Sequence, residues 1–340
     1  MTTSASARQS PMTSAEPSAA TPLKRIVVLG GGTGSFTILS GLKLFPCSLT
    51  AVVNMMDSGG SSGRLRDEFG VLPPGDLRQC LLALSPDDHS GMVLRQLFAY
   101  RFNKGNGLDG HSFGNLFLTV LTEVTGSTEA AIHEMGRLLN IKGEVLPVTL
   151  TDSNLHARLK NGKTVVGEAN IDRRTVDIDV PIDYIYLEPK AYVHPITAQA
   201  LEAADAIVIG PGDLFTSILP NLLVEGVSAA ILRSKAKKIY ICNLMTKHGE
   251  SDGFKASDFI RQVQTYLGSR TVPEHVLVNS ESLPSAMAER YAQEDSHPVA
   301  FDEAECKRLA PHVVATPLMA VGHFVRHDPR RLAEAVLALV

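Results

Sequence analysis

The chain has 340 residues, 44% of them hydrophobic, and a formal net charge of -4 at pH 7. This length and composition suffice for a full hydrophobic core, in one large α/β domain or two smaller ones. The slightly acidic balance argues against a protein that binds duplex nucleic acid, which needs a basic surface, and no apolar stretch approaches the ~20 residues of a membrane span.

The first 22 residues are predicted to form a disordered tail, because they are rich in Ser, Thr, Ala and Pro and contain no hydrophobic segment of the signal-peptide type. The four cysteines are far apart and form no CxxC pattern, which indicates reduced thiols: Cys47, Cys80, Cys242 and Cys306. We therefore expect a cytoplasmic protein.

Strands, turns and helices alternate through most of the chain. Apolar runs at 25–30, 49–55, 206–210, 238–243 and 275–280 are each followed by a glycine-rich or polar turn and a helical pattern. This order predicts an α/β fold, a Rossmann-like three-layer parallel sheet. Further helices are predicted at 76–85, 90–100, 112–125, 128–139 and 329–339.

The pattern changes between residues 143 and 190, where apolar and polar residues alternate and turn sequences intervene. This alternation predicts a small antiparallel β-rich insert. The α/β domain would then consist of two parts, residues 23–142 and 191–340.

Two glycine-rich turns follow the first two predicted strands. The first, GGGTG, departs from the dinucleotide fingerprint GxGxxG because Ser35 stands at the third glycine position, which disfavours NAD-dependent chemistry. We interpret it as a phosphate loop, with a purely structural turn as the alternative. Its candidate ligand contacts are Gly31, Gly32, Thr33 and Gly34.

The second turn, DSGGSSGRLR, brings backbone amides, hydroxyls and a guanidinium together just past a strand end, as phosphate sites do. Its candidate contacts are Asp57, Gly60, Ser61, Ser62 and Arg64. Asp57 needs a cation or a hydroxyl as a partner, which indicates Mg²⁺, a ribose or a sugar. The segment also matches the hydrolase pattern GxSxG, but a nucleophile elbow is disfavoured because only one strand precedes this one.

Later segments add further candidates. Asp76 in PPGDLR is predicted to cap the following helix, and Arg78 in the first turn of that helix indicates a nearby anion or carboxylate. Asn115 is either a buried hydrogen-bonding residue or a ligand contact. The turns after two later strands add Gly210, Gly212, Thr216, Asn243 and Thr246. We expect all these turns to border one crevice, because the carboxyl ends of parallel strands share one sheet edge.

Together these segments resemble the CofD-like superfamily and, within it, the YvcK-type gluconeogenesis factors. The resemblance covers residues 24–328 and rests on these motifs, in order: GGGTG, DxGGSSGRLR, PPGDLR, GNGLDGHSFGNL, GEVLPV, IGPGDLFTSILPNLLV and KIYICNLMTKHGESDGF. It implies a cytoplasmic protein that binds UDP-sugars such as UDP-N-acetylglucosamine and serves cell shape and envelope synthesis during gluconeogenic growth. Homo-oligomers and protein partners in envelope synthesis are compatible with it.

The resemblance also implies two site residues and an alternative function. A late tyrosine and arginine of the YvcK branch match Tyr291 and Arg326, which would contact the base or sugar and the diphosphate. In the CofD branch, a transferase moves a phospholactyl group from a guanosine diphosphate donor to a deazaflavin, with Mg²⁺. Because Ser58 replaces the second acidic residue of the family loop, an Mg²⁺ site at Asp57 would be weakened, and we expect a binding protein with no assigned catalytic residue.

Overall fold

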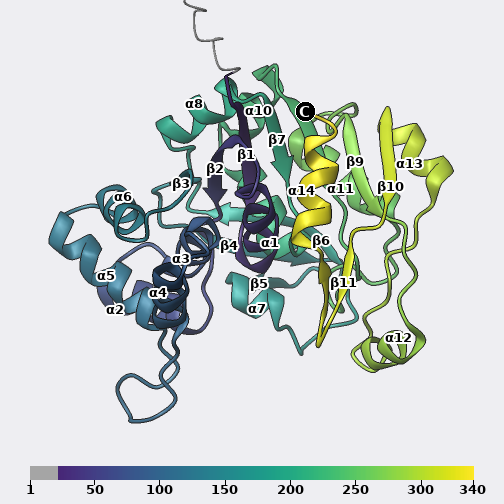
Figure 1. The fold of residues 1–340 in the computed structure, drawn as a ribbon. Coiled ribbons are helices and arrows are strands. Elements are labelled where there is room, and N and C mark those ends of the chain that lie inside the picture. Colours follow the sequence, from purple (N-terminus) through teal and green to yellow (C-terminus); the bar gives the residue numbers. More distant parts are fainter. Residues whose placement is uncertain (1–21) are drawn as a thin grey trace, which may run out of the picture.

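A seven-stranded sheet forms the centre of the computed structural model, which describes residues 22–340 (Figure 1). The predicted tail therefore lies outside the described residues, apart from its last one. The strand order is β10-β9-β8-β7-β1-β2-β3, and every neighbouring pair is parallel. The strands are β1 (Lys24–Gly30), β2 (Cys47–Val53), β3 (Glu144–Pro147), β7 (Ala206–Ile209), β8 (Lys237–Ile241), β9 (His275–Asn279) and β10 (His312–Thr316).

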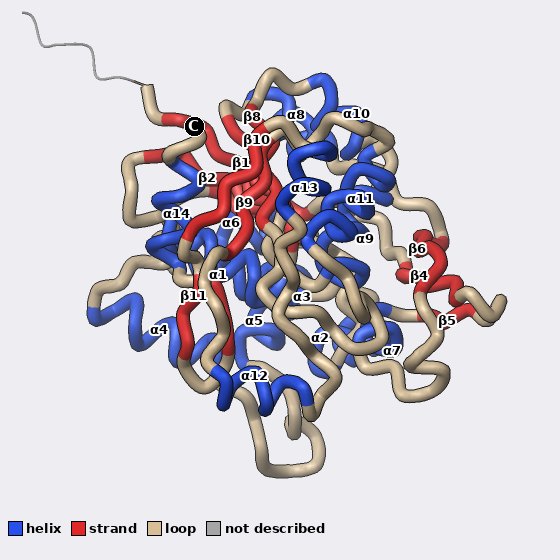
Figure 2. Tube along the Cα trace, turned by 90° about the vertical axis from the view of Figure 1, so that its right-hand side faces the viewer, coloured by secondary structure: helices blue, strands red, loops and turns tan. Residues whose placement is uncertain are grey.

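Helices cover both faces of this sheet and give the predicted three layers (Figures 1 and 2). On one face, α1 (Gly32–Leu42) packs against α3 (Pro74–Leu84) and α14 (Pro329–Leu337). On the other face, α10 (Val227–Arg233) packs against α8 (Pro195–Ala203) and α11 (Ala256–Leu267). The central strands are buried on both sides, which explains their continuous apolar sequences.

The order of the strands places a switch point at the centre of the sheet. From β1 the chain proceeds to β2 and β3 on one side, and then returns to β7, the neighbour of β1 on the other side. Open parallel sheets bind ligands beyond the carboxyl ends of the strands at such a point. The glycine-rich loops after β1, β2 and β7 all lie at this edge.

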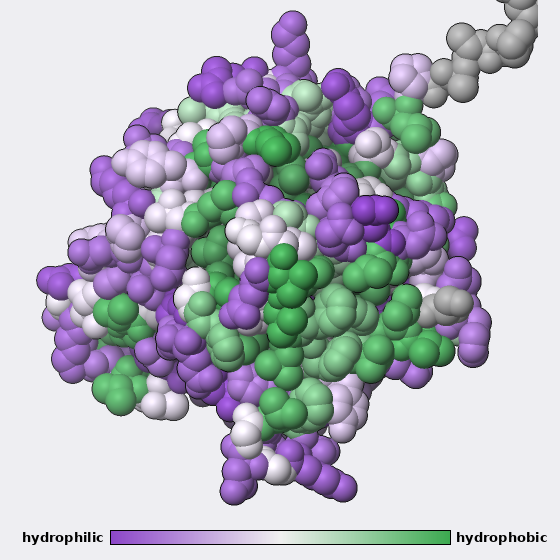
Figure 3. Space-filling model, turned by 90° about the vertical axis from the view of Figure 1, so that its left-hand side faces the viewer, coloured by the Kyte–Doolittle hydropathy of each residue, from purple (hydrophilic) through white to green (hydrophobic). Residues whose placement is uncertain are grey.

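A group of helices flanks the β3 end of the sheet (Figure 1): α2 (Gly60–Phe69), α4 (His89–Ala99), α5 (Phe113–Thr125) and α6 (Thr128–Leu138). The predicted helices at 76–85, 90–100, 112–125 and 128–139 match α3 to α6 within two residues. Apolar side chains gather on the side of the molecule that carries this group (Figure 3). On α5, Val120 and Val124 are 57% and 76% exposed. This face is a candidate surface for the homo-oligomer, which stays a prediction.

The insert differs from its prediction at its start. Strands β4 (Asn154–Leu159), β5 (Thr164–Val166) and β6 (Ile182–Glu188) form an antiparallel sheet, and the short helix α7 (Glu168–Asp172) follows β5. Residues 144–147, which the prediction assigned to the insert, are β3 and pair in parallel with β2. An apolar run of this length does not reveal which sheet it joins.

The helical patterns predicted after residues 206–210 and 275–280 are present as the π-helical turn η1 (Leu214–Ile218) with α9 (Leu219–Leu223), and as α12 (Ser285–Ala292). The elements that were not predicted are α13 (Glu303–Leu309), the edge strand β10, and a hairpin of β11 (Met319–Val321) and β12 (Val325–His327). Within residues 22–340, no helix is long and apolar enough to span a bilayer. All four cysteines are free, as predicted.

Candidate functional site

Most of the predicted site residues line one of two pockets, and Gly31, Gly32, Gly210 and Thr216 line neither. The Asp57 pocket has a volume of about 690 Å³ and the Tyr291 pocket one of about 380 Å³, both within the usual range of small-molecule sites. Of the candidate residues, the Asp57 pocket is lined by Asp57, Gly60, Ser61, Ser62, Arg64 and Asn115. The Tyr291 pocket is lined by Thr33, Gly34, Gly212, Asn243, Thr246, Tyr291 and Arg326. Another cavity, of about 600 Å³ beside α6 and β3, contains none of them.

The first turn of α1 contacts both pockets. A Cβ on Gly31 would overlap the carboxylate of Asp76, which lines the Asp57 pocket, while Thr33 and Gly34 line the Tyr291 pocket. A Cβ on Gly34 would overlap the backbone oxygen of Pro211, so the loops after β1 and β7 touch backbone to backbone. The N-cap residue of α1 is a glycine and makes no side-chain cap, which leaves amides of the first turn for other acceptors.

Asp76 is not the cap of its own helix. Its helix α3 has Pro73 at the N-cap position and begins at Pro74, which places Asp76 within the first turn. Its carboxylate instead accepts a hydrogen bond from the amide of Gly32 in α1. Burial and then the charge of Asp57 raise the pKa of Asp76 well above its usual value. Asp76 is therefore part of the site.

Hydrogen bonds join the serines of the second glycine-rich turn to the start of α5. Ser61 Oγ lies 3.1 Å from His111 Nδ1 and accepts from the amide of Ser112 at 3.3 Å. Asn115 Nδ2 donates to Ser62 Oγ at 3.4 Å, so Asn115 is a buried hydrogen-bonding residue, and its contact with a ligand stays a prediction. Helix α2 begins at this turn, and its N-cap residue is also a glycine without a side-chain cap.

The insert supplies another wall of the Asp57 pocket through α7. Glu168 and Asp172 line the pocket from this helix. Ser58 accepts a hydrogen bond from the amide of Ala169 at 3.0 Å and so holds the start of α7. Burial and then the charge of Asp57 raise the pKa of Glu168 to about 8. No sequence pattern connected the insert with this pocket.

The Tyr291 pocket combines α12, β12 and the loop after β8. The hydroxyl of Tyr291 accepts a hydrogen bond from the amide of Val325 at 3.0 Å, which fixes the ring beside β12. Arg326 is exposed, lies 5.7 Å from the ring centre of Phe324, and forms no ion pair within residues 22–340. Across the described chain, the buried Oδ1 of Asn243 finds no hydrogen-bond partner either. The pocket thus offers an aromatic ring, a guanidinium and an amide to a ligand.

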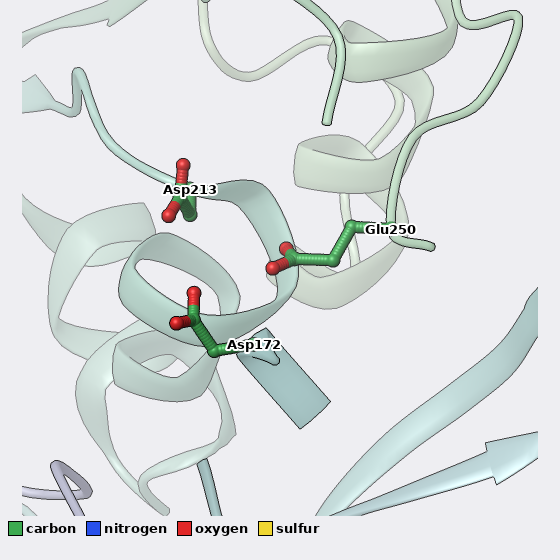
Figure 4. A group of neighbouring side chains, drawn as sticks. All are labelled: Asp172, Asp213 and Glu250. Carbon is green, nitrogen blue, oxygen red and sulfur yellow. The ribbon is translucent and has the colours of Figure 1, made fainter. Parts of the chain in front are cut away.

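An ion cluster separates the two pockets. Figure 4 shows the carboxylates of Asp172, Asp213 and Glu250 directed toward one another. Within residues 22–340, this is the one acidic group whose ligand atoms all lie within 4.8 Å of one another. Lys247 Nζ lies 2.7 Å from Asp213 and 2.8 Å from Glu250, and it also contacts Asp172. An ammonium therefore occupies the place that a metal ion would take.

Lys247 is stabilised in its charged form by this cluster, whereas the carboxylates repel one another. Burial lowers the pKa of Lys247, but the carboxylates of Glu250, Asp213 and Asp172 outweigh this effect and raise the pKa overall. Burial, together with the charges of Asp213 and Asp172, raises the pKa of Glu250 to about 7 against the attraction of Lys247. Glu250 also accepts hydrogen bonds from the amide of Phe215 at 3.2 Å and from the hydroxyl of Thr216 at 3.3 Å. Thr216 and Gly210 line neither pocket, so ligand contact by these two residues stays a prediction.

The fold and the site define an α/β protein of Rossmann-like architecture, with two pockets at the carboxyl edge of its sheet. A family model described as "2-phospho-L-lactate transferase CofD" matches residues 26–319, and the chain belongs to the CofD family.

Proteins named gluconeogenesis factors are similar to this chain over nearly its whole length. The chain is 42% identical over 317 residues to the "Gluconeogenesis factor" of Halalkalibacterium halodurans, with 92% of this chain and 96% of the relative covered. It is 39% identical over 319 residues to that of Bacillus subtilis, with 93% and 98% covered. The crystal structure of protein BH3568 from Bacillus halodurans superimposes with a TM-score of 0.87 at 42% identity, over 93% of this chain and 100% of that one. The predicted family and fold class are confirmed.

Proposed function

We propose that the protein binds a nucleotide sugar such as UDP-N-acetylglucosamine and acts as a regulator of cell shape and envelope synthesis during gluconeogenic growth. The supporting observation is the Tyr291 pocket, where Tyr291, Arg326 and the first turn of α1 line one cavity. An aromatic ring stacks on a base or sugar, a guanidinium binds phosphate oxygens in pairs, and amides at a helix start bind anions. The relatives named gluconeogenesis factors support the link to gluconeogenic growth.

In this proposal the ligand extends from the Tyr291 pocket toward the Asp57 pocket. The diphosphate lies on the first turn of α1, because Thr33 and Gly34 line one pocket and Gly31 packs on the wall of the other. The sugar then points toward Asp57, which accepts a hydrogen bond from a hydroxyl or holds Mg²⁺. Asp57, Asp76 and Glu168 are neighbouring carboxylates, and a divalent cation held by Asp57 would reduce their mutual repulsion.

Isothermal titration with UDP-N-acetylglucosamine tests the proposal. Replacing Arg326 by alanine removes a charge-assisted contact to the diphosphate, and we expect affinity to fall roughly tenfold or more. The matched control is Arg330→Ala, because Arg330 is exposed on α14 and pairs with Glu334 at 3.0 Å. Unchanged affinity in the Arg326 variant would show that the diphosphate lies elsewhere.

The second candidate function is a group transferase, which the description of the family favours. Against it stands Ser58, which holds the start of α7 at the position where the resemblance implies a second carboxylate for Mg²⁺. Titration with GDP and Mg²⁺, with NADH as a redox control, separates the candidates. Tight GDP binding together with phospholactyl transfer to a deazaflavin would replace the nucleotide-sugar proposal.

A further inference from the structure

The Asp57 pocket has an arginine wall that the proposed nucleotide-sugar site does not use. Arg64 on α2, Arg78 on α3 and Arg101 in the loop between α4 and α5 all line it. Within residues 22–340, none of these three guanidinium groups lies in an ion pair with a carboxylate. By contrast, Arg173, which lines the same pocket, forms an ion pair with Asp172, with 3.7 Å between Nε and Oδ2.

The three arginines donate to neutral backbone oxygens instead. Arg64 donates to Asp109 at 2.8 Å, Arg78 to Phe98 at 3.3 Å and Arg101 to Gly110 at 2.6 Å. A carbonyl oxygen accepts a hydrogen bond but carries no net charge, so these three guanidinium groups lack an ion-paired carboxylate among the described residues, although the charges of Asp76 and Asp57 act on Arg78 without an ion pair. Burial and then the charge of Arg101 lower the pKa of Arg78, which shows that these two cations repel each other.

Buried polar groups at the same wall also have unused hydrogen-bonding capacity. Asn115 is 2% exposed, and its Oδ1 has no hydrogen-bond partner among the described residues, as is also true of Arg78 Nε. Either atom of the Asn115 amide can face the pocket, because oxygen and nitrogen exchange on a flip. Buried polar atoms without partners are rare in proteins and point to a missing ligand or water. The uncapped start of α2 adds backbone amides beside them.

Three carboxylates line the same pocket, those of Asp57, Asp76 and Glu168. A ligand that fits both sets of groups carries an oxyanion for the arginines and hydroxyl groups or a bound cation for the carboxylates. The volume of about 690 Å³ is large enough for a small molecule in addition to the sugar end of a nucleotide sugar.

From this geometry we infer that Arg64, Arg78, Arg101 and Asn115 form a second binding site, which takes the phosphate group of a small hydroxylated molecule. The nucleotide sugar of the proposed function does not occupy this site. The inference holds whatever ligand the Tyr291 pocket binds, because it rests only on the residues of the Asp57 pocket.

Titration with inorganic phosphate in a chloride buffer of constant ionic strength tests this site. Arg101→Gln and Arg64→Gln each remove one exposed cation, and we expect each to weaken phosphate binding roughly tenfold or more. Arg101→Lys keeps the charge and should retain most of the affinity, which excludes misfolding as the cause. The matched control, Arg137→Gln on α6, removes a cation that pairs with Glu134 at 3.2 Å and should bind phosphate as the unchanged protein does.

A second titration is made with the protein saturated with UDP-N-acetylglucosamine. Phosphate should bind with the same affinity there, because the site is separate. The inference is wrong if the unchanged protein binds no phosphate, if all three glutamine variants lose affinity equally, or if the nucleotide sugar displaces phosphate. If the nucleotide-sugar proposal is wrong, the protein will not bind UDP-N-acetylglucosamine in its own titration. The phosphate titration of the unliganded protein still tests the second site in that case.

Discussion

Replacing Glu168 by glutamine should stabilise the protein at alkaline pH. The folded state holds the proton of Glu168 more tightly than the unfolded state, because the pKa rises from the usual 4.5 to about 8 through burial and then through Asp57. The stability that this carboxyl contributes is therefore complete below pH 4.5 and is lost as the pH rises through about 8. At about 1.4 kcal/mol per pKa unit this loss is about 5 kcal/mol at most, and partial exposure of the side chain reduces it to roughly 2–4 kcal/mol.

Glutamine suits this test because it can still accept the hydrogen bond that Glu168 receives from the amide of Ser58. Urea unfolding followed by circular dichroism, near pH 5 and near pH 9 with a chelator present, measures the two free energies of unfolding. The unchanged protein should lose roughly 2–4 kcal/mol more than Glu168→Gln between these conditions. Glu123→Gln, at an exposed position on α5, is the control. Equal losses in the unchanged protein and in Glu168→Gln would refute the argument.

Three further variants test the packing of the site and its charges. Gly34→Ala should lower the free energy of unfolding by about 3 kcal/mol or more, whereas Gly322→Ala, with open space around it, should be neutral in thermal unfolding. Lys247→Met should lower the free energy of unfolding by about 3–5 kcal/mol, because it leaves the carboxylates of the cluster without their cation. Added Ca²⁺ should then raise the Tm of this variant, but not that of the control Lys307→Met on α13. Burial lowers the pKa of His327 to about 4, so the free energy of unfolding should fall as the pH drops from 6.5 through 4. In urea unfolding, His327→Gln should show a smaller fall over this pH range. A flat response in Gly34→Ala or Lys247→Met, or an unchanged pH dependence in the histidine variant, would contradict these assignments.

The sheet was predictable because its central strands are buried on both faces. Continuous apolar runs mark β1, β2, β7, β8 and β9, and each ends at a turn that the topology places at the same edge. Strand β3 was assigned to the wrong sheet because its short apolar run carries no sign of its partner. The edge strand β10 was missed because its apolar run, VVA, is only three residues long, and His312, Val314 and Ala315 are exposed at the edge of the sheet.

The division into two pockets was not predictable because distant segments create it. Asp76 looked like the cap of its own helix, but tertiary packing brings its carboxylate to the start of α1. Lys247 lies in a loop that was singled out for Asn243 and Thr246, and its partners come from the insert and from the loop after β7. Pairing of charges across such separations leaves no periodic trace in a sequence.

The contact between the loops after β1 and β7 has a consequence for how ligand preference can change. At Gly34 the main chain meets the main chain at Pro211, so no side chain is present there for a substitution to reshape. A change in ligand preference must therefore come from substitutions away from this contact, on the β12 hairpin or on α7, while the loops after β1 and β7 keep their geometry. Ligand exchange by engineering should accordingly begin at Tyr291 and Glu168 and leave the glycines untouched.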